Sequence, residues 1–135
     1  MPDDPSPLNL DLILRVQRAR MLHDAEAVPS EIGGVYWIEV KPAAPAFAPP
    51  TPRAGFWLIE TSLADIDAMW ETVKAATVAG KLGYKSKAST APRGGKGDPS
   101  QRVICVCTAD RADSADVERV RAALAELGIV PLRYE

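Results

Sequence analysis

The chain has 135 residues, of which 47% are hydrophobic and 25% charged, and its formal net charge is −2. This composition predicts one globular domain over residues 1–135, with enough apolar material for a sizeable core. Met1 is followed by Pro-Asp-Asp-Pro, and no apolar stretch approaches the roughly 20 residues that a membrane span needs, which argues against a secretory leader and a membrane protein. We therefore expect a soluble, unprocessed, cytoplasmic protein.

The first half of the chain predicts one helix and two strands. Apolar side chains at helical spacing predict a helix from Leu8 to Leu22. The β-branched and aromatic residues that follow a glycine pair predict a strand from Gly33 to Lys41. Five prolines then predict an extended, exposed loop over 42–52. A second strand is expected from Gly55 to Thr61, inside the sheet because both of its faces are apolar.

The next elements are a helix and a hairpin of two strands. Ser62 is predicted to cap the helix, which ends at Gly80. The run Gly83 to Thr90 alternates as a strand does, so Lys85 and Lys87 share one face, whereas Tyr84 is expected on the other. A basic loop rich in Gly and Pro over 91–101 leads into a buried strand from Arg102 to Thr108.

The chain ends with a helix capped by Asp113 or Ser114 and terminated at Gly128, then a strand from Ile129 to Tyr134. The order α-β-β-α-β-β-α-β, with short connections between paired strands, predicts an α+β fold with one mainly antiparallel sheet and helices packed on one face. The other face of that sheet would be available to a ligand.

The segment from Gly80 to Arg102 contains six basic residues and a single acid, a net charge of +5 that leaves −7 for the rest of the chain. Such segregation predicts a site for an anionic ligand. Lys85 and Lys87 on one strand face, with Arg102 on the neighbouring strand, could converge on a phosphate group. Lys81 would add charge beside them.

Several other residues are candidates for the same site. The run Arg93-Gly94-Gly95-Lys96-Gly97 could offer backbone N–H groups to a phosphate, although it lacks the P-loop pattern and a mobile loop is the simpler interpretation. Trp37 is the best candidate for an exposed aromatic platform, whereas Trp57 and Trp70 are expected in the core.

The sequence shows no nucleophilic triad, metal cluster or cofactor motif. His23 could act as a general acid but more simply interacts with the end of the first helix. Cys105 and Cys107 share one strand face, where a disulfide would be strained and a C-x-C pair alone makes no zinc site. We expect buried, reduced thiols, which favours a reducing compartment.

Three runs carry a family resemblance: FWLIETSLADIDAMWETVKAATVAGKLGYKSKAST, RVICVCTADRADSADVERVRAALAELGI and LRYE. They resemble the basophilic-leukaemia-expressed protein family over residues 55 to 135. The resemblance implies the fold of the cap-binding translation initiation factor, a curved antiparallel sheet backed by helices. Bacterial relatives are often labelled phosphothreonine lyases. Cys107 stands where the family strand carries a tyrosine, and relatives continue beyond the segment that ends here at Glu135, so we expect site residues from that extension to be absent.

Three functions remain open. The first is a binding module whose sheet face presents Lys85, Lys87 and Arg102, with Trp37, to a phosphorylated small molecule, a nucleotide, a phosphopeptide or a nucleic-acid end. The second, implied by the resemblance, is a phosphothreonine-lyase-like enzyme in which Lys85 or Lys87 removes a proton while Arg102 and Arg93 hold the phosphate. The third is a protein-interaction subunit, with the last strand or the proline loop as a contact and a homodimer as one outcome.

Overall fold

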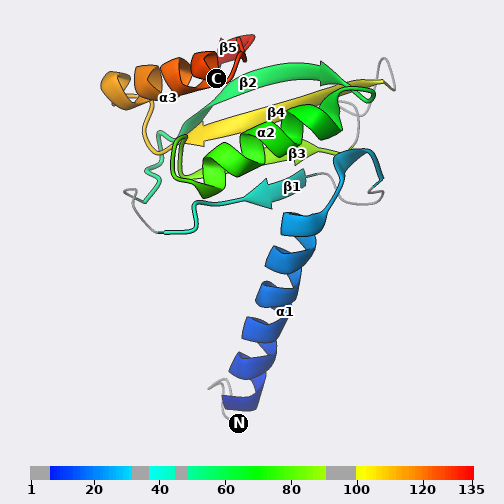
Figure 1. Cartoon of the computed structure of the whole chain (residues 1–135). Helices are drawn as coiled ribbons and strands as arrows, with labels where there is room; N and C mark the ends of the chain where they lie inside the picture. Colours follow the sequence, from blue (N-terminus) through cyan, green and yellow to red (C-terminus); the bar gives the residue numbers. More distant parts are fainter. Residues whose placement is uncertain (1–6, 32–36, 45–48, 91–99) are drawn as a thin grey trace.

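A computed structural model describes residues 7–31, 37–44, 49–90 and 100–135, and it is built around one five-stranded antiparallel sheet (Figure 1). The strand order is β1-β3-β4-β2-β5. The strands are β1 (Trp37–Val40), β2 (Gly55–Ser62), β3 (Lys85–Ser89), β4 (Gln101–Thr108) and β5 (Arg133–Tyr134). This arrangement confirms the α+β class and the antiparallel sheet.

Two helices, α2 (Ile66–Val78) and α3 (Ser114–Glu126), cover one face of this sheet, as expected. The helix α1 (Pro7–Glu26) differs, because the end that leads to β1 meets the sheet near that strand, and the rest of the helix extends away from the sheet (Figure 1). A short 3₁₀ helix, η1 (Pro29–Glu31), follows α1. Among the described residues, no helix combines the length and the apolar character that crossing a bilayer requires.

Helix α2 begins about one turn later than the sequence predicted, whereas α3 begins where it was predicted. Ser62 does not cap α2; its hydroxyl accepts a hydrogen bond from the Asp65 N–H at 3.1 Å, and Asp65 is the residue from which the helix starts. At α3 the expected cap forms, since the Asp113 carboxylate accepts a hydrogen bond from the Asp116 N–H at 3.2 Å. Gly128, with φ at 79°, follows that helix.

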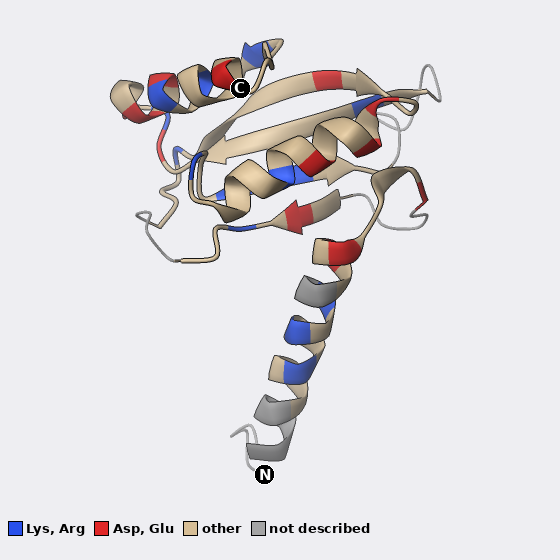
Figure 2. Cartoon of the chain, in the orientation of Figure 1, with Lys and Arg blue, Asp and Glu red and all other residues tan. Residues whose placement is uncertain are grey.

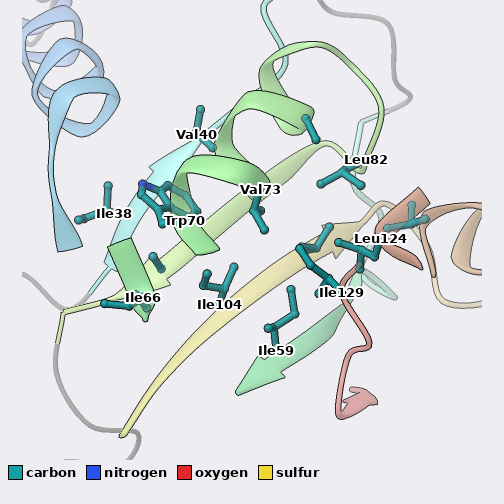
Figure 3. Packing of buried hydrophobic residues seen from close by; sticks show 14 of the residues in the cluster. Ile38, Val40, Ile59, Ile66, Trp70, Val73, Leu82, Ile104, Leu124 and Ile129 are labelled. Atoms are coloured by element: carbon teal, nitrogen blue, oxygen red, sulfur yellow. The ribbon is translucent and has the colours of Figure 1, made fainter. Parts of the chain in front are cut away.

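The core lies between the sheet and the two covering helices (Figure 3). Trp70 and Val73 of α2 are fully buried and pack over the sheet residues Ile38 and Ile104. Leu124 of α3 closes the cluster on the side of β2. Trp70 is thus a core residue, as its place on the apolar stripe of the helix predicted.

A second set of contacts joins the start of β2 to the end of β4. The Arg53 guanidinium forms two hydrogen bonds to the Asp110 carboxylate, at 2.9 and 2.7 Å, and the Thr51 N–H donates to the Ala109 carbonyl. Hydrogen bonding to Arg53 holds the pKa of Asp110 well below its usual range. The proline-rich stretch therefore ends at a fixed point of the sheet, and its described residues are exposed or half-buried.

The last strand is shorter than predicted. The ladder begins only at Arg133, because Pro131 carries no N–H to donate and interrupts regular pairing. Ile129 belongs to the core instead, whereas Val130 is 88% exposed.

We expect Gly83→Ala to destabilise the fold by at least about 3 kcal/mol, because a Cβ at position 83 would overlap the backbone carbonyl of Cys107. Gly128→Ala is the matched control: its Cβ would meet open space, so only the left-handed φ costs about 1 kcal/mol. Urea unfolding measures both changes. Equal losses of unfolding free energy in the two variants would contradict this prediction, because they would show that the Cys107 backbone moves away from residue 83 at little cost.

Candidate ligand-binding site

The candidate site lies on the sheet face opposite α2 and α3, here called the lysine face. In the β3–β4 ladder, Lys85 pairs with Cys107 and Lys87 with Cys105, and paired residues share a face. On the outer side of β3, Glu39 pairs with Lys87. Ile104 alternates with Cys105 and belongs to the core under α2, which places the lysines on the opposite side.

An apolar cluster forms the floor of the lysine face. Its buried members are Leu58, Val103, Cys105 and Cys107, and the partly buried rings of Trp37, Phe56 and Tyr84 pack against them. Both cysteines are buried and neither forms a disulfide, which confirms the expectation of unbridged thiols on one strand face. Polar groups on this face therefore lie over buried apolar side chains, where electrostatic contacts are stronger than in water.

The two lysines make different contacts. Lys87 Nζ lies 4.4 Å from the centroid of the Trp37 ring, within the range of a cation–π interaction. Lys85 Nζ lies 3.6 Å from the Glu39 carboxylate and 5.8 Å from the centroid of the Tyr84 ring. Two neighbouring strands, β1 and β3, thus bring an aromatic plane, two ammonium groups and one carboxylate together.

The pKa of the Cys107 thiol depends on its burial and on the charged groups around it. Burial raises its pKa, Lys85 and Lys87 act in the opposite direction, and Glu39 raises it further. Burial also raises the pKa of Tyr84, with a smaller upward contribution from Cys107. Both side chains are consequently neutral near pH 7, and the charge on this part of the lysine face comes from Lys85, Lys87 and Glu39.

The structure does not place Arg102 with the lysines. Arg102 lies three residues from Cys105, an odd number, so the alternation of β4 turns it toward the helix-covered face. There it is buried, and its Nη1 donates to the Gln101 carbonyl at 2.8 Å. The expected convergence of Arg102 with Lys85 and Lys87 is therefore wrong. Only residues of β4 that are an even number of positions from Cys105, the partner of Lys87, lie on the same face as the lysines.

The other predicted residues are scattered. Lys81 is exposed in the turn after α2, and its carbonyl accepts a hydrogen bond from Arg119. Arg93 and its glycine-rich surroundings lie outside the described residues. Trp57 packs against the core, with its indole N–H donating to the Val117 carbonyl at 2.9 Å. His23 is exposed and hydrogen-bonds Asp24.

Sequence reasoning missed two members of the site. Glu39 shares a face with Trp37 through simple alternation in β1, a signal that was present in the sequence. Tyr84 was expected on the face opposite Lys85, but it sits in a bend before β3 and packs on the apolar floor. No sequence pattern indicates that bend. Within the described ranges, no three His, Cys, Asp or Glu side chains are grouped closely enough to hold a metal ion.

These features define an α+β protein whose antiparallel sheet carries helices on one face and lysines with aromatic rings on the other. Its sequence matches the family described as Basophilic leukemia-expressed protein Bles03 over residues 51–134, and the chain belongs to that family. The matched region runs from the contacts before β2 through β5, so it includes Lys85 and Lys87 but not Trp37 or Glu39. No curated protein matches this chain.

We expect the pKa of Cys107, measured in a Cys105→Ser background, to rise further in Lys85→Gln and to fall in Glu39→Gln. An ammonium group stabilises the thiolate and a carboxylate destabilises it, so removing each has the opposite effect. The NMR shift of a labelled cysteine β-carbon, followed against pH, gives the titration midpoint. Glu60→Gln removes another acid from β2 and should leave the midpoint unchanged; a change as large as that of Glu39→Gln would contradict the local arrangement.

Proposed function

We propose that this chain is a binding module for a phosphorylated, nucleotide-like ligand on the lysine face. The observation that supports the proposal most directly is the pairing of Lys87 with Trp37, with Lys85 on the same face of β3. An aromatic plane beside two ammonium groups offers a stacking surface for a planar ring and positive charge for a phosphate.

The proposed ligand would divide its contacts between these groups. Its planar ring displaces the Lys87 ammonium from its place over the Trp37 ring, 4.4 Å from the centroid, and its phosphate accepts hydrogen bonds from the displaced ammonium. The buried apolar cluster beneath, which includes Cys105 and Cys107, strengthens the contact between ammonium and phosphate relative to the same contact in water.

Glu39 limits which anions bind. Its carboxylate holds Lys85 at 3.6 Å and faces Lys87 across the β1–β3 ladder, so it competes with an incoming phosphate for both ammonium groups. A ligand must therefore gain from stacking as well as from charge. This requirement favours a phosphate attached to an aromatic ring over inorganic phosphate.

Phosphate elimination from phosphothreonine, with Lys85 or Lys87 as the base, is the alternative chemistry at this face. It depended on Arg102 and Arg93 to hold the leaving phosphate. Arg102 lies on the opposite face of the sheet, so elimination requires another group to hold the leaving phosphate. The thiols, which form no disulfide, fit the reducing cytoplasm as the place of action.

Calorimetric titration with nucleoside diphosphates, inorganic phosphate and a phosphothreonine peptide tests the proposal. We expect the nucleotides to bind more tightly than inorganic phosphate, with affinity falling as salt rises. Lys87→Gln should weaken nucleotide binding about fivefold, the effect of losing roughly 1 kcal/mol of charge contact, and Glu39→Gln should strengthen it.

Arg121→Gln is the matched control, since it removes one positive charge from α3 on the other side of the sheet. It should leave affinity unchanged. Equal weakening by Lys87→Gln and Arg121→Gln would reduce the effect to net charge, and the absence of salt-sensitive binding to every ligand would refute the module. Loss of phosphoric acid from the peptide, seen by mass spectrometry, would establish elimination instead.

A further inference from the structure

The face of the Trp37 ring that the proposed ligand needs already holds a positive charge. The Lys87 ammonium lies 4.4 Å from the ring centroid, because the electron-rich face of an indole attracts cations. A neutral ring that takes this place gives up the cation–π contact in exchange for stacking. A group that is itself positively charged keeps that contact while it releases Lys87. The free protein therefore shows what kind of group the Trp37 ring prefers.

Glu39 adds a negative charge beside the same ring. It lies two residues from Trp37 on the same side of β1, about 7 Å along the strand. Figure 2 shows the acidic band of this edge strand, which contains no other acid. The carboxylate lies 3.6 Å from Lys85, and its side chain is 40% exposed, so a ligand can reach it. A positive charge over the Trp37 ring lies within the range at which this carboxylate attracts it.

The charges of these groups do not balance when a phosphate binds alone. Lys85 and Lys87 contribute +2 and Glu39 contributes −1, a sum of +1. A phosphate monoester carries a charge of about −1.5 to −2 near pH 7. Once the phosphate engages both ammonium groups, Glu39 loses the positive charge that it pairs with in the free protein. A positive charge on the ligand restores the balance.

We propose that the ligand of the lysine face is zwitterionic: a phosphate ester on an aromatic ring that also carries a positive charge. The ring and its charge replace the Lys87 ammonium over the Trp37 ring and face Glu39, and the phosphate binds the lysines. Because Glu39 and Lys87 are opposite each other in the β1–β3 ladder, the two charged groups of the ligand lie on neighbouring positions of its ring. The inference rests on the ligand binding proposed above and narrows the ligand class.

Calorimetric titration of the full chain with pyridoxamine 5′-phosphate and pyridoxine 5′-phosphate tests this class. The two probes share a ring and a phosphate, and one has an ammonium group where the other has a hydroxyl, beside the arm that bears the phosphate. We expect pyridoxamine 5′-phosphate to bind about fivefold more tightly, the effect of one exposed charge contact. The ε-methylene protons of Lys87, which lie near the Trp37 ring in the free protein, should change their NMR shift on binding.

Glu39→Gln separates the two probes by the sign of its effect. It should weaken the binding of pyridoxamine 5′-phosphate, whose ammonium group loses its partner, and strengthen that of pyridoxine 5′-phosphate, whose phosphate loses a competitor for the lysines. The Glu39 N–H donates to the Asp24 carboxylate at 3.2 Å, and the substitution leaves this backbone contact in place, which urea unfolding checks. Glu60→Gln is the matched control, since it removes the same charge from β2, two strands from β3 on the same face. It should leave both affinities unchanged.

Two outcomes overturn the inference and leave the binding module in place. In the first, nucleoside diphosphates bind in a salt-sensitive manner, but pyridoxamine 5′-phosphate binds no more tightly than pyridoxine 5′-phosphate. In the second, Glu39→Gln changes both affinities in the same direction, or no more than Glu60→Gln does. A Lys87 signal that does not move places the bound probe elsewhere and also overturns the inference. If no phosphorylated compound binds, the binding module is refuted, and this inference with it.

Discussion

The pairing of β3 with β4 is the constraint on which the rest of the structure depends. Because side chains alternate along each strand, this single register sends Ile104 and Val106 under α2 and sends Cys105 and Cys107 to the other side. The same register fixes Lys85 and Lys87 over the two thiols. Core and candidate site are thus two sides of one ladder, and a slip by one residue would exchange them.

Much of the fold was predictable because its signals are local. Glycines beyond the helices, the acid that caps α3 and the apolar run of β4 identify elements without knowledge of their partners. The antiparallel sheet follows from their order and short connections. The direction of α1 was not predictable, because apolar residues on two sides of a helix indicate a helix but do not tell what it packs against.

The candidate site was predictable only in part for a related reason. Alternation within each strand places Lys85, Lys87 and Trp37 on one face. The face on which Arg102 lies depends instead on the pairing register of β3 with β4, two strands joined by a loop. The number of charges between Gly80 and Arg102 does not tell on which face of the sheet the Arg102 side chain lies. The structure replaces a broad basic surface with a smaller group of side chains, in which one carboxylate opposes two ammonium groups.

Glu39 has two attachments that point in different directions. Its backbone N–H donates to Asp24 at the base of α1, and its carboxylate lies 3.6 Å from Lys85 on the lysine face. One residue of an edge strand therefore connects the base of α1 with the lysine face. Thermodynamic linkage makes any such coupling mutual: if a ligand that displaces Lys85 weakens the contact between β1 and Asp24, then strengthening that contact lowers the affinity for the ligand by the same free energy.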